Sequence, residues 1–104
     1  MTNQVFHILL SLADEPKHGY AIIADIRDRT AGEVLLTAST LYDALARLVD
    51  QGLIAGIAPL RSTHPSDRRR RYYSLTTQGR RAAEAEAARL ARVLDMARAK
   101  RFLA

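Results

Sequence analysis

Apolar residues recur at intervals of three and four along the first third of the chain. One such stripe is formed by Val5, Ile8, Leu9 and Leu12, and it predicts a helix that begins near Thr2 and ends at the polar segment DEPKHG. A second segment, YAIIADIRDRTAG, also separates into an apolar and a polar face and ends in a glycine, a common helix stop. The pattern therefore predicts two helices, followed by a short extended link, EVLL.

The segment ASTLYDALARLVDQG carries the clearest helical pattern in the chain. Thr37 precedes it at the position of an N-cap, where a hydroxyl accepts a backbone N–H of the next turn, and Gly52 ends it. The apolar face consists of Leu41, Ala44, Leu45, Leu48 and Val49. The opposite, polar face consists of Ser39, Thr40, Asp43, Arg47 and Asp50. We expect a third helix with one buried face.

The period of the pattern then changes from helix to strand. The segments LIAGIAP and RRYYSL are compatible with two strands joined by polar turn residues, so we expect a β-hairpin with a basic tip. Alternation points Tyr72 and Tyr73 in opposite directions, so only one of them belongs to the core. Thr76 is a plausible N-cap for a last helix that runs to about Arg101, roughly 25 residues or about 37 Å.

That last helix is too long for a small domain to cover. Its apolar residues alternate four and three apart, the spacing of a helix–helix seam. They are Ala83, Ala87, Leu90, Leu94 and Ala97. We therefore expect the same helix of a second subunit to pack against them. The predicted fold class is mainly α with a small β-hairpin: a winged helix-turn-helix over residues 1–76, followed by a dimerisation helix over residues 77–104.

Composition narrows the class of protein further. A chain of 104 residues forms one domain, and 48% hydrophobic residues with only 6% aromatics indicate a core of Leu, Ile, Val and Ala. The absence of cysteine excludes disulfides and thiolate metal sites, and the first apolar run is too short to cross a bilayer. We expect a cytoplasmic protein.

Positive charge is concentrated in the second half of the chain. Residues 1–60 carry a net charge of −3, whereas residues 61–78 and 79–104 carry +4 each. A surplus confined to one segment and one helix favours a polyanionic partner, although an arginine run can also be a solvated surface. The segment SDRRRRYYSLTTQGRR holds much of this surplus.

Three helices followed by a hairpin, with a small polar turn at the start of the third helix, are the layout of a winged helix-turn-helix. In that fold the third helix enters the major groove of DNA. The groove-facing residues would be Thr37, Ser39, Thr40, Asp43 and Arg47, with Tyr42 at the edge. These positions also fit the ordinary solvent side of a surface helix. The hairpin tip favours DNA, because Arg68, Arg69 and Arg70 suit phosphate or a narrow minor groove.

Other chemistry is weakly represented. The three histidines lie far apart, with no spacing that would converge on a metal, so we expect structural roles and no cofactor. His18, ahead of Gly19, has the position of a helix cap or a buried hydrogen-bond partner. The acids give no pair framed for acid–base catalysis, and no Ser-His-Asp arrangement or phosphate-binding glycine loop is present, so we expect no enzyme.

The chain also resembles a known family, the PadR-type transcriptional regulators. ILLSLADEPKHGYAIIADI is similar to the family's first helix and its His-Gly-Tyr start of the second, and LTASTLYDALARLVDQGLI to its Thr-Leu-Tyr recognition helix. DRRRRYYSLTTQGRR is similar to its wing, the basic hairpin tip, and to the start of its last helix. The resemblance implies a dimeric winged-helix repressor that binds a palindromic operator and is often released by a small hydrophobic or phenolic ligand.

Carried over by position, the resemblance assigns DNA contacts and a dimer interface. Ser39, Thr40 and Tyr42 match the DNA-facing turn, and Arg68 to Arg71 match the wing. The interface joins the last helices with help from the first helix, through Val5, Phe6, Leu9, Ala83, Ala87, Leu90, Leu94 and Ala97. An effector pocket between subunits would be lined by Phe6, His7, Leu94 and Met96, for which dry interface packing is the alternative.

The sequence also departs from the family pattern at two positions. Ala38 stands where proline is frequent, and Asp43 stands where a basic residue is often found, so Asp43 would accept from a cytosine amino group or act by repulsion. Two other functions stay open. One is a winged-helix protein-interaction module without sequence-specific DNA binding. The other is a basic membrane-surface protein, which the Ala-rich last helix with its single terminal Phe disfavours.

Overall fold

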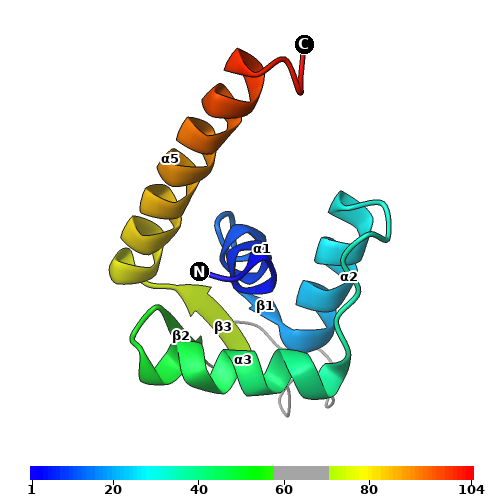
Figure 1. Cartoon of the computed structure of the whole chain (residues 1–104). Coiled ribbons are helices and arrows are strands. Elements are labelled where there is room, and N and C mark those ends of the chain that lie inside the picture. Colours follow the sequence, from blue (N-terminus) through cyan, green and yellow to red (C-terminus); the bar gives the residue numbers. More distant parts are fainter. Residues whose placement is uncertain (58–70) are drawn as a thin grey trace.

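The computed structural model describes residues 1–57 and 71–104 (Figure 1). The elements are α1 (Asn3–Ser11), β1 (Lys17–His18), α2 (Gly19–Arg29), α3 (Ala38–Asp50), β2 (Ile54–Ile57), β3 (Tyr72–Leu75) and α5 (Thr77–Ala99). The predicted fold class is confirmed, because the described chain is mainly helical with one small antiparallel sheet. The predicted arginine tip, Arg68 to Arg70, lies outside the described residues.

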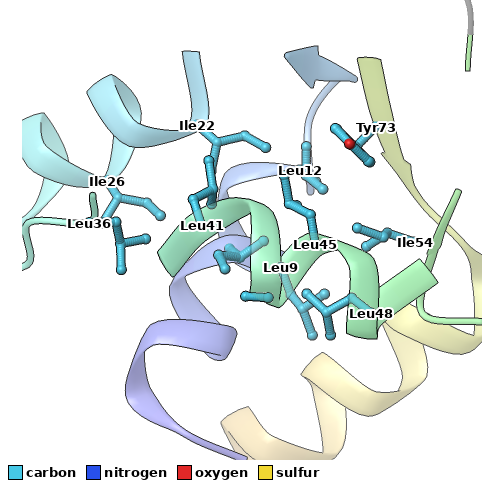
Figure 2. Close-up of a cluster of buried hydrophobic side chains, with 12 residues drawn as sticks. Leu9, Leu12, Ile22, Ile26, Leu36, Leu41, Leu45, Leu48, Ile54 and Tyr73 are labelled. Atoms are coloured by element: carbon cyan, nitrogen blue, oxygen red, sulfur yellow. The ribbon is translucent and has the colours of Figure 1, made fainter. Parts of the chain in front are cut away.

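One hydrophobic core holds α1, α2, α3 and the sheet together (Figure 2). The apolar stripe of α1 supplies Ile8 and Leu9, and that of α3 supplies Leu41 and Leu45; all four side chains are fully buried. Leu9, which is predicted to lie in a subunit interface, also belongs to this core. Its side chain has 0% exposure within a single chain, because the stripe of α1 on which it lies is used for the core.

Four helices begin with a side chain that accepts a hydrogen bond from the first turn. Thr37 accepts from the backbone N–H of Thr40 at 3.1 Å, and Thr76 accepts from that of Gly79 at 3.0 Å, as predicted for both. His18 caps α2 through Nδ1. Thr2 caps α1 in the same way. Each such cap stabilises its helix by about 1 kcal/mol.

The sheet contains one strand that the hydrophobic pattern did not indicate. Its order is β1-β3-β2, with both pairs antiparallel, so β3 is the central strand. β1 has only two residues, Lys17 and His18, which pair with Tyr73 and Tyr72. The expectation that one tyrosine belongs to the core is confirmed, since Tyr73 is only 7% exposed. The ring of His18 meets Tyr72 edge-on at 5.4 Å between centroids.

The start of α5 is fixed to the end of α3 and the start of β2. The hydroxyl of Thr76 donates to the carbonyl of Gly52 at 2.7 Å, and its backbone N–H donates to the carbonyl of Leu53 at 3.2 Å. Gly79 then brings the first turn of α5 against Leu53, so closely that a β-carbon at Gly79 would overlap the Leu53 carbonyl oxygen. The direction of α5 is therefore set by backbone contacts at this junction.

Beyond its first turns α5 leaves the body of the molecule (Figure 1). The molecule measures 54 × 28 × 22 Å, and 23 residues of helix account for about 34 Å of that length. This outer half exposes Leu90, Val93, Leu94 and Met96. No helix within the described ranges is both long and apolar enough to cross a membrane.

Candidate nucleic-acid interface

α3 presents to solvent a side that is polar except for Ala46. Its core side is buried through Leu41, Ala44, Leu45 and Leu48. At 100° per residue, the positions opposite the core are Ser39, Asp43, Ala46 and Asp50, and all of them are exposed. We call these four residues the polar face of α3. Thr40 and Arg47 are also exposed and lie along one flank of it, and Tyr42 lies along the other. The structure thus places every predicted α3 contact on the solvent side.

The hydroxyls at the start of α3 are arranged in a chain. The hydroxyl of Thr37 accepts the N–H of Thr40 and donates to the hydroxyl of Thr40 at 3.0 Å. Thr37 is therefore committed to the helix start. The Thr40 hydroxyl accepts that bond and keeps its own proton for an acceptor outside the helix.

The ring of Tyr42 lies close to the start of α2. Its side chain is 42% exposed, and a β-carbon built on Gly19 would lie 2.5 Å from the Tyr42 hydroxyl oxygen and 2.7 Å from the ring carbon that carries it. A larger residue at position 19 would displace this ring. The sequence predicted a ring that packs inward with its hydroxyl toward the backbone of a bound duplex. The structure places the hydroxyl at the amino end of α2.

The charge of the α3 surface is not basic. Asp43 and Asp50 lie on the polar face, and Arg47 on its flank is the only basic residue of the helix. None of the three forms an ion pair among the described residues. The helix alone would thus add little attraction for phosphate, and the positive surplus lies elsewhere in the chain.

Two arginines already form ion pairs with carboxylates of the same chain. Arg29 binds Asp25 at 2.8 Å, and burial, which would raise the pKa of Asp25, is outweighed by this hydrogen bond and charge, so that the pKa lies below its usual value. Arg89 forms two hydrogen bonds to Glu86, at 2.7 and 2.8 Å, which hold the pKa of that carboxyl below its usual range. The net charge of a segment does not reveal these ion pairs, because they depend on which residues lie on the same face of a helix.

Arg71 is the wing residue that the structure describes. It is exposed, and its aliphatic carbons lie over Gly56 on the neighbouring strand, 3.1 Å from where a β-carbon of Gly56 would be. Gly56 thus makes room for the stem of this arginine on the sheet surface. The three arginines before it lie outside the described residues.

A family model described as the transcriptional regulator PadR-like family matches residues 8–85, well over half of the chain. The chain belongs to this family. Members of the PadR-like family are transcription regulators and not enzymes. No curated protein matches the chain.

Solved structures agree with this PadR-like assignment. A PadR family transcription regulator from Clostridium difficile is 26% identical, with a TM-score of 0.79 over 96% of this chain and 97% of that one. A PadR family regulator from Eggerthella lenta is 29% identical, with a TM-score of 0.71 over 88% and 75%. The fold is also shared with Bacillus subtilis PadR in complex with operator DNA, at 22% identity and a TM-score of 0.69 over 84% and 48%.

The residues predicted for a dimer interface lie in three places in this PadR-like chain. Phe6, Ala83 and Ala87 line a shallow groove of about 170 Å³ between α1 and α5. Leu90 and Leu94 continue along the exposed outer half of α5. Val5 faces away from this groove, toward α3, where it lines a larger cavity.

The predicted effector residues are not gathered within one subunit. Phe6 lines the groove between α1 and α5, whereas His7, Leu94 and Met96 line neither that groove nor the cavity beside α3. Met96 lies in the exposed outer half of α5. Any cavity that contains all four residues would therefore need a second subunit.

Proposed function

We propose that this PadR-like chain is a sequence-specific double-stranded DNA-binding repressor that acts in the cytoplasm as a homodimer. Residues 1–76 form the DNA-reading unit and residues 77–104 the dimerisation helix. The dimer binds a palindromic operator, and a small hydrophobic or phenolic effector held between subunits by Phe6, His7, Leu94 and Met96 releases it.

The observation that carries the proposal is the polar face of α3. A helix with one buried apolar side and one exposed, mainly polar side, capped at its start by Thr37, has the form of a recognition helix. Bacillus subtilis PadR, which has the same fold, was solved in complex with operator DNA, and this supports DNA binding by the present chain. Ser39, Thr40, Asp43 and Arg47 would face the major groove, with the hydroxyl of Tyr42 toward a phosphate.

The outer half of α5 supports a homodimer. Its apolar residues recur at i, i+3, i+4 and i+7, as in a helix seam: the exposed Leu90, Val93 and Leu94, and the partly exposed Ala97. A single chain leaves this stripe in water, and the α5 helix of a second copy would cover it. Paired α3 helices would then reach successive major grooves, about 34 Å apart along a duplex.

The test begins with selection of bound fragments from genomic DNA. Binding to the selected duplex and to a scrambled duplex is then measured by fluorescence anisotropy over a salt series. Arg69→Ala with Arg70→Ala should weaken binding to both duplexes and reduce the salt slope by roughly one unit per lost phosphate contact. Arg92→Ala, a matched change on the exposed surface of α5, should leave the slope unchanged. An unchanged slope in the double variant would remove the wing from the mechanism.

The variant Thr40→Val distinguishes a contact to bases from a contact to the DNA backbone. It removes the outward hydroxyl and keeps the shape, so it should cost about 1–3 kcal/mol on the selected duplex and little on the scrambled one, because base contacts specify and phosphate contacts position. Equal losses on both duplexes would contradict a groove contact. No binding to either duplex at low salt would favour the alternative, a winged-helix protein-interaction module.

A further inference from the structure

A cavity of about 410 Å³ lies between the start of α1 and one flank of α3. Its volume is within the range of about 300–1,000 Å³ that is typical of small-molecule sites. The apolar wall includes Val5, Ile8 and Leu48, and the rim includes Thr40 and Arg47. These two rim residues belong to the flank of α3 that is proposed to contact DNA, so the cavity and the DNA-contacting surface share side chains.

The cavity leaves apolar surface uncovered. Val5 and Leu53 pack against the edge of the hydrophobic core but remain only partly buried. A ligand with an apolar part would remove this surface from water, which favours binding in proportion to the area covered.

The charged side chain at the cavity determines which polar group the ligand must carry at its other end. Arg47 is the only ionisable side chain among the residues that line it, all of which lie in the described part of the chain. It has no ion-pair partner within the described residues. A guanidinium offers two parallel N–H donors that match a carboxylate, and the Thr40 hydroxyl adds a third donor nearby.

We propose that this cavity binds a small carboxylate with an apolar tail. The carboxylate pairs with Arg47, and the tail lies against the partly buried Val5 and Leu53. When the ligand is bound, Arg47 and Thr40 contact the ligand and not DNA, so the ligand lowers the affinity of α3 for DNA. This second step rests on the proposed function. The site lies within one subunit, and it is separate from the inter-subunit cavity proposed above.

Binding is tested first without DNA. The full 15N-labelled chain is titrated with sodium octanoate and followed by amide chemical shifts, with sodium acetate and octan-1-ol as controls. Octanoate should shift the amides around Val5, Thr40 and Arg47 at concentrations where acetate and octanol do not. Shifts confined to the groove between α1 and α5, or equal binding of octanol, would overturn the proposal.

Two pairs of variants test the two ends of the ligand. Arg47→Gln should weaken octanoate binding about tenfold, whereas Arg92→Gln should not change it. Gln4 is exposed and lines the cavity, so Gln4→Trp should fill it and abolish saturable binding, whereas Asn3→Trp, one position away on the exposed surface, should not. These residues lie outside the core, so we expect the variants to fold, and circular dichroism checks that they do. Unchanged affinity in either cavity variant would refute the site.

Competition with DNA is tested separately. Octanoate, but not acetate at the same ionic strength, should lower the affinity of the wild-type chain for the selected duplex and leave Gln4→Trp unaffected. If octanoate binds as expected but the chain binds no DNA, the proposed function fails and the carboxylate site stands. If the chain binds DNA and octanoate has no effect on that binding, the regulatory step is refuted.

Discussion

Replacing Gly79 with alanine tests the junction at which α5 joins the DNA-reading unit. In most helices this change is stabilising by up to about 1 kcal/mol, because alanine has the higher helix propensity. Here the added β-carbon would overlap the carbonyl oxygen of Leu53 and lie 2.9 Å from a methyl carbon of Leu75. The first turn of α5 would have to move away from β2. The sign of the effect therefore depends on whether this backbone contact exists.

The expected size follows from the contacts that such a movement would break. Two hydrogen bonds from Thr76, to Gly52 and Leu53, are worth about 1 kcal/mol each. Overpacking a close contact costs about 1–3 kcal/mol more. After the gain in helix propensity, we expect a loss of about 2–4 kcal/mol in the free energy of unfolding, or a fall of roughly 10–20 °C in Tm.

Urea and thermal unfolding, followed by circular dichroism at one fixed protein concentration, measure this loss. The fixed concentration matters because association would raise the apparent stability. Arg81→Ala, an exposed change two residues further along the same helix, should alter the free energy of unfolding by no more than about 0.5 kcal/mol. If Gly79→Ala is as stable as the wild type or more so, α5 does not meet the sheet in this way.

Three further changes probe the dimer, a carboxylate and the start of α2. Leu90→Lys should raise the dimer dissociation constant by about 10-fold or more. Leu90 is 41% exposed in one chain, so each of two symmetry-related copies loses about 0.6–1.2 kcal/mol of burial; an unchanged dissociation constant in light scattering would contradict this. The lowered pKa of Asp25 means that its pairing with Arg29 stabilises the fold above about pH 4 and is lost as the pH falls through the lower, folded-state pKa. Asp25→Asn should therefore flatten the loss of stability in acid, and an unchanged acid slope in urea unfolding would count against the pairing. Gly19→Ala should displace the ring of Tyr42 and weaken binding to the selected duplex. A Tyr42→Ala, Gly19→Ala double variant should bind no more weakly than Tyr42→Ala alone, because the ring that clashes is then absent, and an additive loss would contradict this contact.

Much of the fold could be predicted from the sequence because its signals are local. The buried face of α3 and the caps Thr37 and Thr76 depend on spacing within a few residues, and they were predicted correctly. The strand β1 was missed because two residues carry no period, and it exists only through its pairing with β3.

The candidate site was harder to predict, because which side of a helix is buried depends on the elements that pack against it. Leu9 and Val5 belong to one periodic stripe, but α1 is covered by several elements, which bury Leu9 in the core and leave Val5 beside α3. The contact between Tyr42 and Gly19 joins residues 23 positions apart, and no single segment indicates it.

His18 and Gly19 connect three parts of the molecule at adjacent positions. His18 caps α2 and meets Tyr72 of β3, and Gly19 receives Tyr42 of α3. α3 and β3 are therefore both held against the start of α2. A duplex bound in the proposed way must fit both at once, so groove width and curvature would be selected along with base sequence.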